Sequence, residues 1–275
     1  MKKKAKRWLG TPIVGVYAVI TLYPLIWMVF QSLKSDQEFY MNQYAPPIEP
    51  LWENYLSAWE KANFAAYFQN SIIVTGVSLV VLIFVCTLAA YAFSKIKFAG
   101  RAFFLGLLMA VLFLPSTVLN FPVYTIVKQL HIDNTYWGMI GPYVCGSIPI
   151  SIMVLKSAYD DIPNEIAEAA KIDGCSEFQT WWRVMFPLVK PAVATITILA
   201  FIAIWNEYQW ALISVSDAKL YTLPVGISHV ASKIYSFGYG TVFAGMVMVT
   251  LPVILLYLLL QKQFVKAISS GAVKG

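Results

Sequence analysis

Six long apolar segments dominate this sequence, and they constrain its fold more than any other feature. Each is about as long as the ~20 residues that an α-helix needs to cross a bilayer. Backbone N–H and C=O groups find no water in the hydrocarbon core, so such a segment must bond its own backbone as a helix. We therefore predict an all-α membrane protein with six transmembrane helices. The predicted spans are Thr11–Gln31, Ser71–Phe93, Phe103–Val127, Tyr136–Leu155, Ala192–Val215 and Thr241–Leu260.

The composition agrees with this class. Apolar residues make up 59% of the 275 residues and charged residues 12%, against about 45–50% and about 25% in typical soluble domains. So few charges exclude a soluble enzyme, a disordered chain and a free nucleic-acid-binding protein. The three cysteines form no C-x-x-C pair and suggest neither a zinc site nor a disulfide framework.

The basic residues predict the orientation of the chain. With the N-terminus inside, fifteen of the 20 Lys and Arg side chains fall on the inner side of the membrane, and cytoplasmic loops carry such an excess. Both termini are therefore expected in the cytoplasm of a multi-pass cell-membrane protein. The expected organisation is a cytoplasmic N-terminus (1–10), one six-helix transmembrane domain (11–264) and a cytoplasmic tail (265–275). The first span is long for a signal peptide and no small-x-small cleavage site follows it, so we expect it to be retained.

The loop between the fourth and fifth spans, about 156–191, is predicted to form two short helices. Pro163 suits the first turn of the first helix, and Gly174 suits its end, because glycine adopts the left-handed conformation. Ser176 and Gln179 form a candidate capping box for the second helix, which Pro187 and Pro191 are expected to end. Periodicity alone also allows a connector that lies on the lipid surface. The small residues expected to let another protein approach closely are Ala167, Ala169, Ala170 and Gly174.

The residues of this loop resemble a known motif. Glu168-Ala169-Ala170, then Asp173-Gly174, then Phe186-Pro187 is similar to the EAA loop of ABC importer permeases. Phe186 replaces the usual Leu, and Cys175 stands where Ala is common. Six spans with both ends inside and this loop between spans four and five also match that family, over about Ser71 to Gly275.

Within that family, the sequence most resembles the carbohydrate importers, on the side of the maltose-type second permease subunit. Trp205-Asn206-Glu207-Tyr208, followed by Trp210, looks like the Trp-Asn-Glu-aromatic segment common there. Asn70-Ser71 looks like that group's Asn-Ser start of the second span. The tail Gly271–Gly275 looks like the short Gly-rich tail of those subunits.

The resemblance implies a permease subunit of an ATP-driven, binding-protein-dependent importer of carbohydrate, by analogy an oligosaccharide. The chain has no G-x-x-x-x-G-K-[ST] motif for nucleotide phosphates. It is therefore expected to be no enzyme and to hold no cofactor or metal, with ATP and Mg bound by a partner ATPase. The implied partners are a second homologous permease, an ATPase dimer, an extracytoplasmic sugar-binding protein, membrane lipid and the carbohydrate, but no nucleic acid. The implied ATPase-coupling residues are Glu168, Ala169, Ala170, Asp173 and Gly174.

Polar side chains inside the predicted spans are candidates for the substrate pathway. Glu207 is the only acid in any of these spans, and a carboxylate at membrane depth is costly unless it faces a cavity or a partner. Asn206, Gln209 and Trp210 fall at i, i+3 and i+4 and are predicted to share a helix face, where they can contact a sugar. An aromatic belt or interhelical hydrogen bonding would explain the same residues. The candidates are Asn120, Tyr143, Asn206, Glu207, Gln209 and Trp210.

The main alternative is an ion-coupled secondary transporter of a small polar solute. Such proteins often show inverted repeats and buried charges, and this sequence shows no clear repeat and a single buried acid. A membrane-embedded enzyme is disfavoured because neither histidine lies in a span and no H-E-x-x-H or G-x-S-x-G occurs. A voltage-gated channel would need an Arg-rich span, which is absent.

Overall fold

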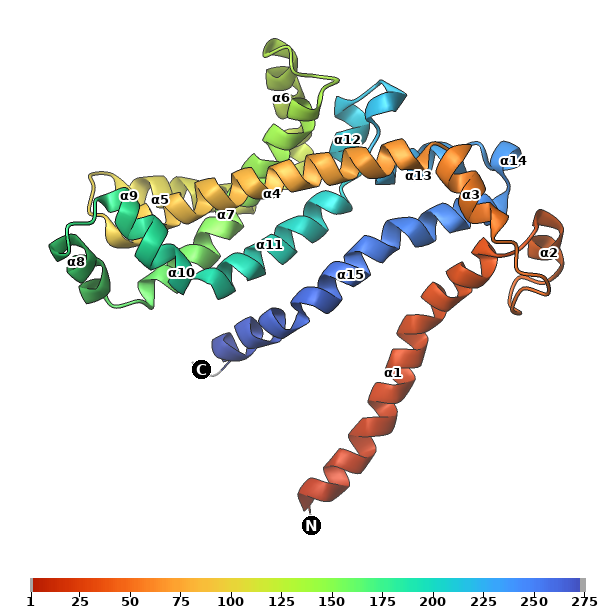
Figure 1. The fold of residues 1–275 in the computed structure, drawn as a ribbon, viewed down its shortest axis with the longest axis horizontal. Coiled ribbons are helices and arrows are strands. Elements are labelled where there is room, and N and C mark those ends of the chain that lie inside the picture. Colours follow the sequence, from red (N-terminus) through yellow and green to blue (C-terminus); the bar gives the residue numbers. More distant parts are fainter. Residues whose placement is uncertain (1, 273–275) are drawn as a thin grey trace. The chain divides into compact units, whose positions relative to one another are not determined.

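The chain folds into helices joined by short loops (Figure 1). The computed structural model describes the backbone of residues 2–272 and the side chains of residue 12 and residues 14–259. Over these residues the structure contains no β-strand, which agrees with the predicted all-α class. The last three residues of the predicted Gly-rich tail lie outside the described residues.

The helices group into two compact units, Met1–Phe68 with Val225–Pro252 and Gln69–Pro224 with Val253–Gly275. The first unit holds α1 to α3, the start of α4, most of α13, all of α14 and the first part of α15. The second unit holds the rest of α4, the elements from α5 to η3 and the remainder of α15. In chain order, the elements are α1 (Lys2–Ser32), α2 (Asp36–Met41), α3 (Glu53–Glu60), α4 (Phe64–Lys95), α5 (Arg101–Ala110), η1 (Val111–Phe113), α6 (Ser116–Gln129), α7 (Tyr136–Asp160), α8 (Asn164–Ile172), α9 (Glu177–Gln179), η2 (Thr180–Met185), α10 (Phe186–Leu188), α11 (Lys190–Trp205), α12 (Gln209–Ser214), η3 (Ala218–Leu220), α13 (Leu223–Ala231), α14 (Ile234–Phe237) and α15 (Tyr239–Ala272).

Four described helices are long and apolar enough to cross a membrane by themselves: Val14–Ser32, Phe64–Lys95, Tyr136–Asp160 and Tyr239–Leu259. Two further helix pairs pass the same test but are sharply bent. The chain therefore has four continuous candidate spans, and six only if each bent pair counts as one. The predicted positions of the first, second, fourth and sixth spans agree with the four continuous helices.

The predicted third span is broken rather than straight. Arg101–Phe113 and Ser116–Gln129 meet at an angle of 112°. Leu114 and Pro115 form this break, and Leu114 is extended, with φ −90° and ψ 127°. The ring of a proline disfavours the α conformation in the residue that precedes it, so the apolar segment Phe103–Val127 is interrupted at Pro115.

The predicted fifth span is also interrupted. α11 ends at Trp205, and the chain leaves the helix before α12 begins at Gln209. A continuous helix over Ala192–Val215 was therefore wrong. At its other end, α11 is bent by 79° from the helical run Glu177–Leu188.

The second span begins earlier than predicted. Asn63 has a positive φ of 61°, and α4 starts directly after it, so Asn70 and Ser71 lie inside the helix. The Asn70 amide donates to the carbonyl oxygens of Lys219 and Tyr221 at 2.8 and 2.9 Å and accepts from the Tyr136 hydroxyl at 2.7 Å. Ser71 accepts a hydrogen bond from the first residue of α13. The Asn-Ser pair thus holds the α12–α13 connection against α4.

In the first unit, aromatic side chains surround the start of α15. Phe39 stacks on Tyr239 with ring centroids 4.2 Å apart, and Trp27 meets Phe243 edge-on at 5.3 Å. The Asp36 carboxylate accepts the backbone N–H of Tyr239 at 2.7 Å. An acid at a helix N-terminus satisfies an N–H group that has no partner inside the helix, so α2 caps α15.

In the second unit, α4, α7 and α11 form the apolar core. The Trp210 indole of α12 donates to the Gly138 carbonyl of α7 at 2.9 Å, in a buried position. The largest fully buried aliphatic and thioether side chains of this unit are Leu82, Met139, Ile152, Leu155, Met185, Ile196 and Ile198.

A methyl group at Gly138 is expected to destabilise this packing. A Cβ there would lie 2.5 Å from the Ile132 carbonyl oxygen, whereas a Cβ at Gly141, one turn on in the same helix, meets nothing within 4 Å. Gly138→Ala should lower the free energy of unfolding in detergent by about 1–3 kcal/mol, because backbone must move to make room. Gly141→Ala is the matched control and should be neutral or slightly stabilising. Equal effects of the two substitutions would contradict this packing.

Candidate functional site

The predicted pair of short helices is present between α7 and α11. The first is α8, and the second is the run Glu177–Leu188, which consists of α9, the π-helical η2 and α10. Pro163 is the residue just before α8, with ψ 142°, rather than a member of its first turn. Pro187 lies within α10 and does not end the helix, and the bend falls at Val189 instead. We call this segment, residues 164–188, the hairpin.

Gly174 closes the first helix in the manner that the sequence predicts. Its φ is +86°, and its N–H donates to the Lys171 carbonyl at 3.0 Å while the N–H of Cys175 donates to the Ala170 carbonyl at 3.0 Å. These two bonds form the Schellman motif, which satisfies carbonyls that the helix end would leave unpaired. A Cβ at Gly174 meets nothing within 4 Å, so the need for glycine here is conformational.

The second helix begins with the predicted capping box. The Ser176 side chain accepts from the backbone of Gln179 at 3.3 Å, and the Gln179 side chain accepts from the backbone of Ser176 at 2.9 Å. An ion pair of 2.5 Å between Lys171 and Glu177 joins the two helices across the turn. The turn is therefore held by its backbone, by a cap and by a charge pair.

The exposed face of the hairpin differs in part from the prediction. Ala167 and Ala170 are 6% exposed, so they are packed inside the protein instead of leaving a small-residue surface. Of the coupling candidates, Ala170 is buried, and the exposed ones are Glu168, Ala169, Asp173 and Gly174. Ile172, at 86% exposure, adds a large apolar side chain beside them. Sequence reasoning missed Ile172, although its place one residue before Asp173-Gly174 marks it as part of the exposed turn.

Glu207, the acid expected in the fifth span, lies in the break between α11 and α12. Its carboxylate accepts the Tyr143 hydroxyl at 2.7 Å and the backbone N–H groups of Trp210 and Ala211 at 2.8 and 3.1 Å. Two of these donors are N–H groups in the first turn of α12, which have no partner inside that helix. Glu207 thus caps α12 and ties it to α7.

The other pathway candidates of this region are separated by the break. Asn206 is the residue that ends α11, where its amide donates to the Ile202 carbonyl at 2.8 Å, and Gln209 begins α12. The predicted common helix face of Asn206, Gln209 and Trp210 is therefore wrong, because the helix stops between them. Trp210 is 5% exposed, whereas Asn206 and Gln209 are exposed. Asn120, in α6, is half-buried.

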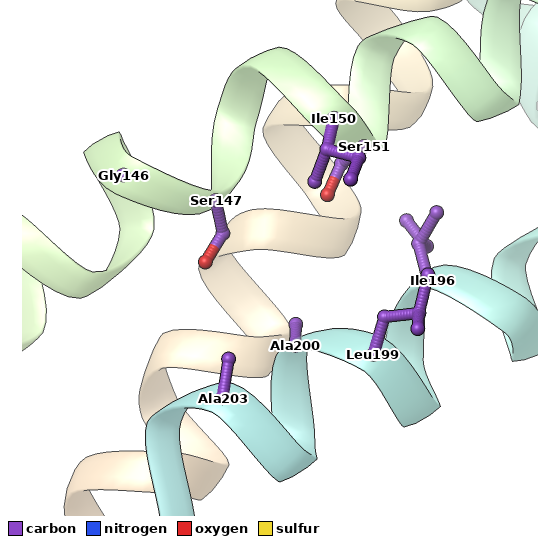
Figure 2. A pocket seen from close by; sticks show the side chains of 8 residues that line it. All are labelled: Gly146, Ser147, Ile150, Ser151, Ile196, Leu199, Ala200 and Ala203. Atoms are coloured by element: carbon purple, nitrogen blue, oxygen red, sulfur yellow. The ribbon is translucent and has the colours of Figure 1, made fainter. Parts of the chain in front are cut away.

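A hollow of about 280 Å³ lies between α7 and α11, and none of the pathway candidates lines it. Figure 2 shows Ser147 and Ser151 of α7 and the α11 side chains across from them. In the sequence, this hollow corresponds to small residues spaced along α7 and α11. Its lining residues are Gly146, Ser147, Ile150, Ser151, Ile196, Leu199, Ala200 and Ala203. Among the side chains that the structure describes, no three His, Cys, Asp or Glu gather as metal ligands would.

The conformational role of Gly174 predicts an order of substitutions. Gly174→Val should destabilise the hairpin by about 1–2 kcal/mol, because an L-residue with a branched side chain disfavours positive φ. Gly174→Asn should cost clearly less, since asparagine adopts this conformation more readily. Limited proteolysis of the hairpin and thermal unfolding in detergent measure both. Equal sensitivity of the two variants would contradict a conformational role.

The bracing role of Glu207 predicts coupling with Tyr143. Glu207→Gln removes a carboxylate oxygen and leaves at least one buried donor unpaired, so it should lower the free energy of unfolding by about 1–3 kcal/mol. After Tyr143→Phe, the same change should cost less, because the pair acts as one unit. A double-mutant cycle measured by denaturation in detergent provides the test, and strictly additive losses would contradict the brace.

Comparison with known proteins places the chain in a family. Residues 83–270 match the family described as "Binding-protein-dependent transport system inner membrane component". The chain is 36% identical over 278 residues to the "Probable ABC transporter permease protein YurM" of Bacillus subtilis (strain 168), covering 100% of this chain and 92% of the relative. It is 33% identical over 260 residues to the "Trehalose/maltose transport system permease protein MalG" of Thermococcus litoralis, covering 94% of this chain and 93% of the relative.

The fold agrees with that of a solved permease. The chain matches a chain in the crystal structure of a bacterial ABC transporter involved in the import of the acidic polysaccharide alginate, with a TM-score of 0.84 and 24% identity. The match covers 95% of this chain and 97% of that one. The family match and the relatives confirm the resemblance to ABC importer permeases, and this chain belongs to the family of binding-protein-dependent transport system inner membrane components.

Proposed function

We propose that this chain is the permease subunit of an ATP-driven, binding-protein-dependent carbohydrate importer and forms half of its translocation pathway with a second, homologous permease. The observation that carries the proposal is the family match over residues 83–270, which includes the hairpin. The MalG-type relative, whose name states trehalose and maltose transport, supports a carbohydrate substrate. We infer an oligosaccharide, delivered by an extracytoplasmic sugar-binding protein.

The hairpin is proposed as the docking element for a separate ATPase dimer, which binds ATP and Mg. Its geometry supports this role, because the turn at Gly174 is held rigidly and presents exposed Glu168 and Asp173 beside exposed Ile172. An apolar anchor with charges beside it is a typical protein-docking surface. In this proposal, ATPase closure displaces the hairpin and thereby the spans. Both chain termini and the hairpin then lie in the cytoplasm, as the basic residues predict.

Within the pathway, we propose a division of roles among the candidates. Tyr143, Glu207 and Trp210 hold the break between α11 and α12 through hydrogen bonds. Asn206 and Gln209, exposed on either side of that break, offer amide groups to sugar hydroxyls. Asn120 lies after the other break, where α5 gives way to α6. Irregular backbone at membrane depth occurs where it is buried in protein or lines a water-filled cavity, which supports a pathway beside these two breaks.

The proposed ATPase docking is tested by co-purification from the native membrane in detergent. The wild-type chain should bring down an ATPase, and Gly174→Asp should lose it or lose sugar uptake, because an aspartate there adds a charge and strains the turn. Gly174→Asn has a neutral side chain of similar size and is the control for side-chain bulk. It should retain more of the ATPase co-purification and of the sugar uptake than Gly174→Asp. Sugar uptake by the wild-type chain in vesicles without any ATPase would contradict the proposal and favour an ion-coupled transporter.

A further inference from the structure

We propose that one end of α4 fastens the hairpin at two separate points, so that α4, α7 and the hairpin move as one body during the transport cycle. The positioning residues are Tyr91, Ser94 and Lys95. This inference rests on the proposed function, because it concerns how displacement of the hairpin reaches the spans.

The three residues share one face of the last turn of α4. They stand at i, i+3 and i+4, which places their side chains next to one another on a helix. Each reaches a different segment of the chain: the second helix of the hairpin, the end of α7 and the start of α8. Figure 1 shows α8 and α9 beside this end of α4.

Lys95 holds the entry to the hairpin. Its ammonium donates to the Ile162 carbonyl at 2.5 Å and to the side-chain oxygen of Asn164 at 2.8 Å. Asn164 is the first residue of α8, and Pro163 before it offers no side-chain cap. One residue earlier, the Ser94 hydroxyl donates to Asp160 at 2.6 Å. Hydrogen bonds with a charged partner are roughly twice as strong as neutral ones, so the α7–α8 junction is firmly tied to α4.

Tyr91 holds the return helix. Its hydroxyl donates to the Glu177 carboxylate at 3.0 Å, and the other oxygen of that carboxylate pairs with Lys171 in α8. Tyr91 is 2% exposed, so its hydroxyl donates from a buried position to a carboxylate whose side chain is 51% exposed. A single carboxylate thus links α4 to both helices of the hairpin.

Aromatic packing backs these polar contacts. The rings of Tyr91 and Tyr159 pack edge-on with their centroids 5.8 Å apart. Phe84, which lies about two turns before Tyr91 in α4, packs edge-on against Trp181 with centroids 5.9 Å apart. Tyr159 and Trp181 are both fully buried. The hairpin could rotate about a single bond as about a hinge. Two attachment points, together with the ring contacts, oppose such a rotation.

The first test compares coupling in the assembled transporter, reconstituted with its ATPase and binding protein. Tyr91→Phe with Lys95→Met removes one hydroxyl and one ammonium but keeps the bulk of both side chains. The sugar transported per ATP hydrolysed should fall about fivefold, while the ATPase still co-purifies. When Lys95→Arg replaces Lys95→Met in this double variant, a donating cation is kept, and most of the wild-type ratio of sugar to ATP should return. Lys97→Met, which removes an exposed charge two residues on, is the matched control and should leave it unchanged.

The outcomes separate this inference from the proposed function. An unchanged ratio in the double variant, or a loss equal to that of Lys97→Met, overturns the fastening role. Loss of ATPase co-purification also overturns it, because the residues would then serve docking rather than transmission. Transport by the wild-type chain without an ATPase would remove the proposed function itself.

A second test asks directly whether the parts move together. Ser94→Cys and Asp160→Cys, joined by a short bifunctional thiol reagent, replace the hydrogen bond between α4 and α7 by a covalent link. The chain would also carry Cys145→Ser and Cys175→Ser, so that the reagent finds the intended pair. If the two helices move as one body, the linked transporter keeps its uptake. Loss of uptake on linking, compared with the same variant treated with a monofunctional reagent, would overturn the inference.

Discussion

Backbone hydrogen bonding without water is the constraint on which this structure depends. Inside a bilayer, every N–H and C=O group must find a partner in the protein, and the continuous helices meet this need along their length. Where a helix stops and another begins, as between α11 and α12, the first N–H groups of the new helix need partners from outside it. At the α11–α12 break, Glu207 accepts two such N–H groups, from Trp210 and Ala211, and the Tyr143 hydroxyl. The Glu207 carboxylate, which is costly at membrane depth, thus takes the place of the carbonyl acceptors that a continuous helix would have offered to these N–H groups.

The same requirement shapes the hairpin, whose helices are short and end close together. Four C-terminal carbonyls and four N-terminal N–H groups of each helix need partners from outside it. The Schellman motif at Gly174 and the capping box at Ser176 provide several of them locally. Lys95 and Tyr91 provide further contacts from α4. A turn satisfied in this way has few alternative conformations, which suits an element proposed to transmit the movement of an ATPase.

Local features of the hairpin were predictable, and features that depend on packing were not. Ser176 bonds a residue three positions away and Gly174 needs only its own left-handed conformation, so sequence spacing was sufficient for both. The burial of Ala167 and Ala170 was missed, because an alanine occurs equally well on the inner and the outer side of a helix and tertiary packing decides between them. The prediction that Asn206 and Gln209 share one helix face was wrong, because periodicity carries no information on where a helix stops.

The sequence by itself determined that the chain is helical and membrane-embedded, which segments are apolar, and which turn the loop before the fifth span adopts. These follow from composition and from contacts within four residues. Only the tertiary structure decided the partners of Asn70, Tyr91, Lys95 and Tyr143, which lie 64 to 151 residues away along the chain. Such pairs depend on how each helix is rotated and placed against its neighbours, and that is set by packing over the whole unit rather than by any local pattern.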